Sequence, residues 1–231
     1  MFIRQVDVYA AYLAYTDYEI GRVIQAVEDM GKLDNTLIIY ISGDNGSSAE
    51  GQLIGTPNEV AMFNGVQVPV GDQLKYFYDV WGTDRTYNHM AVGWTWAFDT
   101  PFTWTKQIAS HFGGTRQGVA ISWTGHITDL GVSTISSTTS LTSCLPILEV
   151  TGIPAPAVVN GIPRRPMEGV SIAYTFDKAN TDAPSTHHTQ HFEMMGDHAL
   201  YHHGWIASTK VIRPPWEVIG PVNQDPFDAR G

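Results

Sequence analysis

The sequence contains a single cysteine, Cys144, among 231 residues. One cysteine excludes an internal disulfide framework and a cysteine-rich zinc module, since both need several thiols. Basic residues are also few: 13 Lys and Arg stand against 23 Asp and Glu, which gives a formal charge of −10. We therefore expect no nucleic acid partner, because phosphate binding requires a basic surface.

Long hydrophobic runs are absent as well. No apolar stretch reaches the roughly 20 residues of a membrane helix, so we expect no membrane span. The N-terminus does not have the pattern of a signal peptide. Residues 1–7 lead directly into a helical pattern with no strand before it, which indicates a piece of a larger protein. Even so, 43% of the residues are hydrophobic, which is enough to bury a core.

The most informative stretch is residues 37–48, LIIYISGDNGSS. An apolar, β-branched run that ends in turn residues predicts a strand buried on both faces of a parallel sheet. Ligands collect at the carboxyl ends of such strands, and Asp44 and Asn45 stand at this one. Their oxygens are of the kind that calcium or magnesium prefers. The alternative is a plain Asp-Asn-Gly turn, which these residues favour for local reasons.

Residues 7–31 have the pattern of a long amphipathic helix before that strand. Asp7 is the expected N-cap and Gly31 the expected C-cap. Apolar residues recur at spacings of three and four, which predicts one stripe packed on a core. The stripe consists of Tyr9, Leu13, Thr16, Ile20, Val23, Val27 and Met30.

Residues 49–101 are rich in glycine and aromatic residues and keep no regular period. We expect an ordered loop excursion beside the site, with short helices near residues 58–63 and 72–81. Its Trp94, Trp96 and Phe98 fit two interpretations. They either wall a pocket for an aromatic or sugar ring, or form a satellite core that holds the loop down.

Residues 100–116, TPFTWTKQIASHFGGTR, form the second chemical segment and lead into a predicted buried strand at residues 118–123. Lys106 carries a compact ammonium that neutralises an oxyanion. Near a metal it would stabilise charge on a transferring sulfuryl or phosphoryl oxygen. The alternative for an isolated lysine is a solvated surface charge. His111 is expected to be packed.

These motifs resemble the sulfatase family, specifically the arylsulfatases of the alkaline-phosphatase-like superfamily. Sulfatases carry a Ser/Thr-x-Asp-Asn-Gly strand end, a Pro-Phe-Arg-x-x-Lys segment followed by Gly-Gly-x-Arg, and a C-terminal Tyr-Phe-Glu-Met-x-Gly segment. The matching residues here are Asp44, Asn45, Gly46, Pro101, Phe102, Lys106, Gly113, Gly114, Arg116, Phe192, Glu193, Met194 and Gly196.

The resemblance implies an α/β fold: part of an alkaline-phosphatase-like, mostly parallel sheet with flanking helices over residues 1–185, then a small antiparallel subdomain over residues 186–231. It implies hydrolysis of a small-molecule sulfate ester. Asp44 and Asn45 would bind Ca²⁺, with Mg²⁺ as the alternative metal. Lys106 would be the catalytic, substrate-binding contact to the sulfate, and Arg116 would be structural.

The nucleophile of that family is missing from this sequence. Sulfatases make a formylglycine from Cys/Ser-x-Pro-Ser/Thr-Arg. Cys144-Leu145-Pro146 imitates the first three positions, but Ile147 and Leu148 follow, so we interpret Cys144 as a small buried apolar residue. The family's paired Asp-Asp strand end is also missing. We therefore expect the C-terminal portion of a sulfatase, inactive alone and complemented by an N-terminal sulfatase segment or chain.

Six of the nine histidines fall between His187 and His203. Spacings of four would build transition-metal sites on a helix, but the pattern here predicts strands, where such residues lie too far apart for one ion. Solvated or packed imidazoles are expected. Two alternatives to a sulfatase remain: a related hydrolase of phosphate esters or sulfamates, and a non-catalytic binding or assembly module that uses the aromatic excursion or the histidines.

Overall fold

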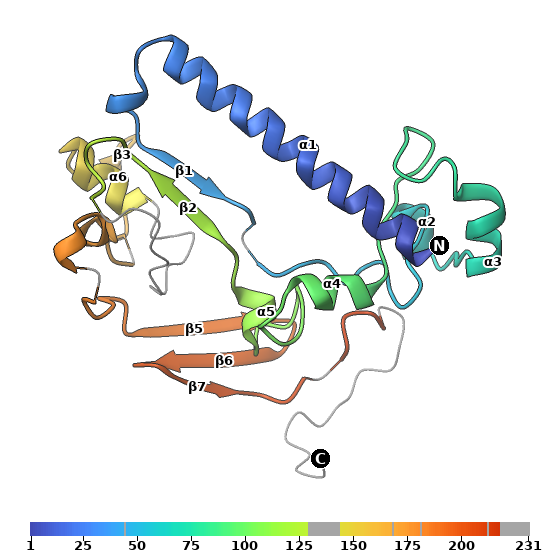
Figure 1. Ribbon diagram of the computed structural model, residues 1–231. Coiled ribbons are helices and arrows are strands. Elements are labelled where there is room, and N and C mark those ends of the chain that lie inside the picture. Colours follow the sequence, from blue (N-terminus) through green and yellow to red (C-terminus); the bar gives the residue numbers. More distant parts are fainter. Residues whose placement is uncertain (44, 129–143, 168, 181, 212, 218–231) are drawn as a thin grey trace.

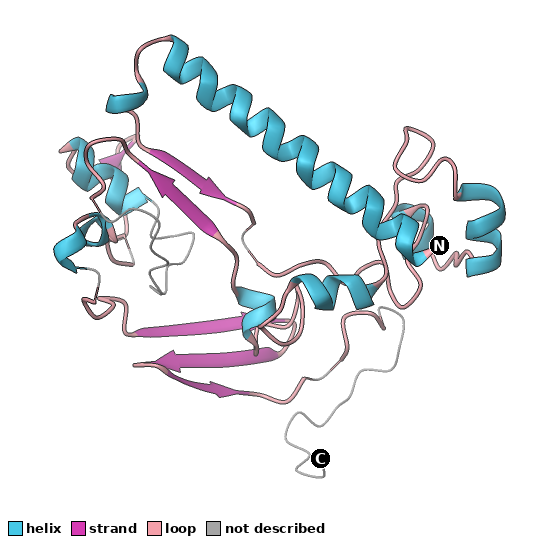
Figure 2. Cartoon of the chain, viewed as in Figure 1, coloured by secondary structure: helices cyan, strands magenta, loops and turns pink. Residues whose placement is uncertain are grey.

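The computed structural model describes residues 1–43, 45–128, 144–167, 169–180, 182–211 and 213–217 (Figure 1). Helices and strands are both present, in agreement with an α/β protein (Figure 2). The strands form a two-stranded β1–β2 sheet, a two-stranded β3–β4 sheet and a three-stranded β5–β6–β7 sheet. The long helix α1 runs along one side of the molecule, and the β5–β6–β7 sheet lies on the opposite side.

Helix α1 (Phe2–Asp29) has 28 residues and begins before the predicted start. Asp7 lies inside the helix, so the predicted N-cap is wrong, and Met1 takes that position. The C-terminal end agrees with the prediction. Gly31 has a φ of +63°, its N–H donates to Glu28 O, and Lys32 N donates to Val27 O. This pair of hydrogen bonds is the Schellman motif, which favours glycine.

The expected burial of the α1 stripe is wrong for part of its length. Leu13, Val23 and Met30 are exposed, with Val23 at 67%, and Gln5 is the one buried residue of the helix. The reason is that α1 is anchored to the rest of the described chain near its N-terminal end, where Gln5 is enclosed. None of the described helices combines the length and apolar character of a membrane span.

Strands β1 (Ile38–Ile41) and β2 (Val119–Ser122) lie where they were predicted but pair antiparallel, with Ile38 opposite Ser122. Each strand pair within the described sheets is antiparallel, so the mostly parallel sheet is not confirmed. The predicted burial on both faces is also wrong, since Tyr40, Ile41 and Val119 are exposed. In the described chain β1 and β2 form a two-stranded antiparallel sheet rather than the interior of a parallel sheet, in which both faces are covered.

Much of the hydrophobic core lies in residues 49–101, which were expected to be a loop excursion, and the core extends beyond them to Ile108 and Ala109. Its buried apolar residues include Ala49, Met62, Trp81, Met90, Ala91, Val92, Ile108 and Ala109. The predicted first helix is α2 (Glu59–Phe63), with Asn58 as N-cap accepting from Ala61 N at 2.9 Å. The second is shorter than predicted: α3 (Val70–Asp72) continues as the π-helix η2 (Gln73–Phe77). Helix α4 (Val92–Phe98) was not anticipated.

Gln5 fastens α1 to this core. Its amide nitrogen donates to Ile54 O at 2.9 Å and contacts Gln73 Oε1 at 3.3 Å, and its Oε1 accepts from Ala91 N at 2.9 Å. Both glutamine side chains are fully enclosed. Buried amides are tolerated where their hydrogen-bonding groups are satisfied, which is the case here.

The remaining short elements join these parts. They are η1 (Leu33–Asn35), α5 (Phe112–Thr115), α6 (Cys144–Thr151), β3 (Val158–Val159), β4 (Ile162–Pro163), η4 (Ala173–Phe176) and η5 (Lys178–Asn180). Cys144 is exposed at the start of α6, so the expectation that it is buried is wrong.

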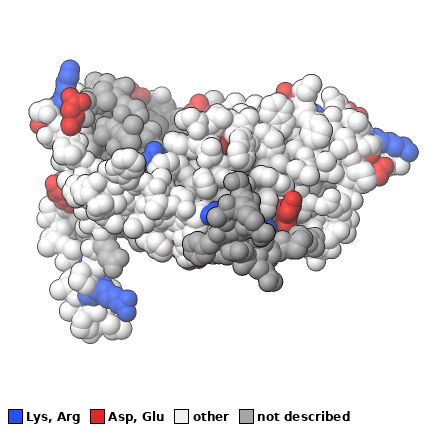
Figure 3. Space-filling model, turned by 90° about the horizontal axis from the view of Figure 1, so that it is seen from below, with Lys and Arg blue, Asp and Glu red and all other residues white. Residues whose placement is uncertain are grey.

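The predicted C-terminal antiparallel sheet is present. It consists of β5 (Thr189–Met194), β6 (Asp197–His202) and β7 (Trp205–Ser208), one strand more than expected from the sequence. Ala199 of β6 is buried. Lys and Arg are scattered over the molecular face in Figure 3 and form no patch on it.

Candidate functional site

The loop after β1 carries the predicted metal ligands. Asp44 lies outside the described residues. Asn45 is half-buried and Gly46 is buried. Within the described part of the chain, no group of three or more His, Cys, Asp or Glu is arranged to hold a metal ion. Among the described residues, the candidate site therefore consists of the Asn45 carboxamide and the residues of neighbouring loops that lie close to it.

The loop from Asn45 to Ser48 packs directly on the segment that contains Lys106. Lys106 N donates to Ser47 O at 3.0 Å. Gly46 lies against the carbonyl group of Gly113, at a separation that leaves no room for a Cβ atom. Segments that are far apart in the sequence, at residues 46–47, 106 and 113, are thus joined through their backbones.

The backbone around Lys106 is unusual. Trp104 has a φ of +68° and Gln107 a φ of +80°, in the left-handed region that non-glycine residues seldom occupy. Such conformations persist where surrounding contacts hold them, and they gather at functional sites. One such contact is from Gln107 Nε2 to Glu50 Oε1, at 2.9 Å. The Lys106 side chain is half-buried and makes no hydrogen bond or ion pair with the described residues.

Asp99 touches this loop and was not singled out from the sequence. The residue is 9% exposed, and its carboxylate accepts the Ser47 N–H on both oxygens, at 3.1 and 3.2 Å. Burial raises the pKa of the Asp99 carboxyl above its ordinary value of 3.8, and the hydrogen bonds from Ser47 partly oppose that shift. No sequence signal marked this residue, because the contact spans 52 positions.

Ser48 ties the same loop to two further elements. Its carbonyl accepts from Thr95 Oγ1 of α4 at 2.6 Å, and its hydroxyl lies 2.9 Å from His89 Nε2. Together with Asp99 and Lys106, these contacts fix the chain immediately after Asn45. The segment that follows the predicted metal ligand is therefore held from several sides.

The aromatic residues of the excursion pack on one another. Trp94 Nε1 donates to Phe2 O at 3.0 Å, and the Phe98 ring lies 5.0 Å from that of Tyr9 in α1. Trp96 contacts Trp104 and Trp216, with ring centroids 5.6 and 6.2 Å away. These contacts support the interpretation of a satellite core over that of a ligand pocket.

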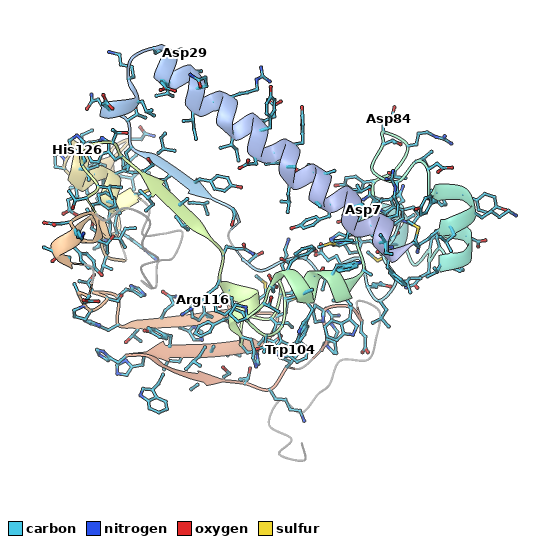
Figure 4. All side chains as sticks on the ribbon, viewed as in Figure 1. Asp7, Asp29, Asp84, Trp104, Arg116 and His126 are labelled. Atoms are coloured by element: carbon cyan, nitrogen blue, oxygen red, sulfur yellow. The ribbon has the colours of Figure 1, made fainter. Side chains whose placement is uncertain are left out.

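Arg116 is held by two aromatic rings. Its guanidinium lies 3.8 Å from the Phe112 ring centroid and 5.3 Å from that of Phe102. Burial lowers the pKa of Arg116, although the charge persists at any physiological pH. Figure 4 shows Arg116 and Trp104 where α5 approaches the β5–β6–β7 sheet. This environment agrees with a structural role.

His111 is packed beside the same loop. Its Nδ1 lies 2.9 Å from Ser110 Oγ, and its ring is 5.9 Å from that of Trp104. Burial lowers the pKa of the imidazole below its ordinary value of 6.5.

The C-terminal histidines lie on strands and at their ends, as expected. His188 stacks on His203, and His191 on His198, with ring centroids 4.5 and 5.7 Å apart. His202 Nδ1 lies 2.8 Å from Thr189 Oγ1. Stacked rings direct their nitrogens sideways rather than toward one point, which agrees with the lack of a metal-binding group among the described residues.

These features define an α/β chain with a polar loop site at the end of β1, where Asn45 stands close to the Lys106 segment. The family model described as Sulfatase matches residues 3–146, more than half of the chain. The chain therefore belongs to the sulfatase family.

One relative is an uncharacterized sulfatase of Schizosaccharomyces pombe, 47% identical over 51 residues. That stretch is 22% of this chain and 9% of the relative, so the chain corresponds to a small part of that protein.

Proposed function

We propose that this chain is part of an arylsulfatase-like hydrolase of sulfate monoesters, to which it contributes metal ligands and a sulfate contact. Asp44 and Asn45 bind Ca²⁺, with Mg²⁺ as the alternative, and Lys106 contacts the sulfate. The observation that carries the proposal is the backbone packing of Gly46 and Ser47 on Lys106 and Gly113. Family membership supports hydrolase chemistry in general.

The donors suit a hard cation. A carboxylate and a carboxamide offer oxygen atoms, and the Asn45 side chain is half-buried beside the Lys106 loop. When bound, calcium would hold the sulfate oxygens and neutralise their charge. Calcium takes about six to eight oxygen ligands, so two protein ligands leave most of the shell to other groups. Those groups include ligands from outside this chain.

Lys106 supplies a positive charge to the sulfuryl group. Its ammonium donates to an oxygen that gains negative charge as the ester bond breaks, and such stabilisation acts most strongly where water is excluded. The formylglycine nucleophile comes from elsewhere, because the sequence contains no Cys/Ser-x-Pro-Ser/Thr-Arg motif.

The partner that we propose is an N-terminal sulfatase segment or chain. Two features support it. Large apolar residues of α1 are exposed, with Ile3 at 72%, and β1 pairs with one strand in the described chain. A segment that adds strands beside β1 and covers α1 would remove this apolar surface from water, which is favourable.

The proposal is tested by activity and mass together. The purified 231-residue chain should hydrolyse aryl sulfates no faster than background. Adding an N-terminal sulfatase segment with the formylglycine motif should give metal-dependent turnover, and native mass spectrometry should show a complex of the two. Turnover by the purified chain alone would contradict the proposal, as would the failure of every such segment to associate.

Two substitutions separate the roles within the complex. Asn45→Ala should weaken calcium binding, whereas Lys106→Ala should lower kcat and leave calcium affinity unchanged. Arg22→Ala, at an exposed helix position, is the control. Replacing the sulfate ester by the matching phosphate ester or sulfamate tests the alternative substrates, and faster hydrolysis of either would reassign the enzyme.

A further inference from the structure

We propose that Asp99 is a positioning residue that fixes the backbone on which Asn45 is mounted. The role of Asn45 as a metal ligand rests on the proposed function, whereas the contact between Ser47 and Asp99 is independent of it. Ser47 is two residues after Asn45, and its N–H is directed at the Asp99 carboxylate, with both oxygens within 3.2 Å. A backbone amide held in this way cannot rotate without losing a charge-assisted hydrogen bond.

The Asp99 carboxylate lies in an environment that disfavours a negative charge. Asp99 is buried, and a buried charge costs free energy unless it is paired. Asp99 is also the C-cap of α4, the helix end at which negative charge is unfavourable. No cation is paired with it among the described residues. The contact that compensates for the burial of this charge is the hydrogen bond from Ser47 N–H. We therefore infer that the carboxylate serves to hold the loop.

Asp99 belongs to a clamp with two further contacts. Thr95 Oγ1, one turn earlier in α4, donates to Ser48 O, and Lys106 N donates to Ser47 O from the opposite segment. Three of the four backbone groups from Ser47 N–H to Ser48 C=O are thus held by side chains or backbone of other elements. Of the groups that hold them, only the Asp99 carboxylate is charged.

The clamp is itself anchored to α1. Phe98, adjacent to Asp99, contacts the Tyr9 ring, and Trp94 donates to Phe2 O. A fixed path therefore runs from α1 through α4 and Asp99 to the loop of Asn45. Groups that orient metal ligands from outside the coordination shell typically change metal affinity by about 10- to 100-fold when removed.

The first test measures the contact directly. Amide hydrogen exchange of Ser47, followed by NMR on the full chain, should be slow in the wild-type protein. It should be at least about tenfold faster in Asp99→Ala than in Asp99→Asn, because the carboxamide oxygen still accepts the N–H. Fast exchange of Ser47 in the wild-type protein would overturn the proposal, and this measurement needs no variant to fold.

The second test measures the consequence. Calcium chloride is titrated into the complexes of the same proteins with the N-terminal sulfatase segment, and the shifts of the Asn45 side-chain amide are followed. We expect Asp99→Ala to bind calcium about tenfold or more weakly and Asp99→Asn to stay close to the wild-type affinity. The control is Asp177→Ala, which removes a carboxylate that accepts a backbone N–H from Ala179, away from the loop.

The outcomes distinguish the two proposals. If Asp99→Ala binds calcium as the wild-type protein does, the positioning role is wrong. If the wild-type complex binds no calcium, the proposed metal site fails, and the positioning of the Asn45 backbone still stands or falls on Ser47 exchange. If Asp99→Asn is as impaired as Asp99→Ala in both measurements, the hydrogen bond is not the cause and the proposal is overturned.

Discussion

The backbone of Gly46 lies against the carbonyl group of Gly113, and no side chain fits between them. A Cβ atom at Gly46 would overlap that carbonyl and would lie 3.0 Å from Lys106 N. Both neighbours are backbone atoms, which cannot move aside as the end of a flexible side chain can. The close packing of these two segments therefore requires glycine at position 46, because no other residue lacks a Cβ atom.

Gly46→Ala should consequently disturb the site and lower stability. Forcing a methyl group into a packed position typically costs about 1–3 kcal/mol. The control is Gly21→Ala in α1, where an added Cβ meets nothing within 4 Å and alanine is the better helix former by about 0.5–1 kcal/mol. In urea unfolding, Gly46→Ala should lower the free energy of unfolding, whereas Gly21→Ala should raise it. Equal stability of Gly46→Ala and the wild-type protein would contradict the close packing.

Gln5→Leu should be strongly destabilising although the position lies on a helix. The change leaves Ala91 N buried without its partner and removes the shorter of the two hydrogen bonds to Ile54 O, and an unsatisfied buried group costs about 1–3 kcal/mol. The control is Gln25→Leu, whose amide bonds exposed carboxylates on the same helix. Thermal unfolding should show a lowered Tm for Gln5→Leu and little change for Gln25→Leu. Similar effects of both would contradict the role of Gln5 as an anchor.

Gln5 also illustrates where sequence reasoning stops. The helix, its C-terminal glycine and both strands of the β1–β2 pair follow from local pattern, because periodicity and turn residues act over a few positions. Gln5 bonds to Ile54, Gln73 and Ala91, which are distant in sequence and carry no local mark. A polar residue in a helical pattern is ordinarily solvent-exposed, so its burial could not be anticipated.

The candidate site was likewise predictable where a sequence motif marked it and not where it depends on long-range contacts. Lys106 and the diglycine at Gly113 were found through the family resemblance, and the structure brings them to the loop of Asn45. Asp99 was missed, because its partner is a backbone N–H and backbone groups are the same in every sequence. The core was misplaced for a related reason: residues 49–109 bury their apolar side chains through irregular turns and short helices, which are too short to show a clear period.

His111 should make the stability of the protein depend on pH. Burial lowers the pKa of the folded-state imidazole below 6.5, so the unfolded chain binds more protons between the two values. Stability gained from this group is therefore present above about pH 6.5 and is lost as the pH falls toward the folded-state pKa. His111→Gln should remove the part of the acid-induced loss of stability that this imidazole causes. The free energy of unfolding in urea, measured between about pH 8 and pH 5, checks this. The same pH profile in both proteins would contradict the assignment.

Arg116 should not be replaceable by lysine. Its planar guanidinium lies on the Phe112 ring and near that of Phe102, and a compact ammonium cannot reproduce this stacking. Because the interaction is partly desolvated, its loss should lower the free energy of unfolding by about 0.5–2 kcal/mol. The matched control is Arg22→Lys, where the exposed ion pair with Glu19 should contribute little in either form. Urea unfolding of the two variants should separate them, since only the change at Arg116 removes an aromatic contact. If Arg116→Lys were as stable as the wild-type protein, the rings would not be what holds this side chain, and an anion contact would become the better account of its charge.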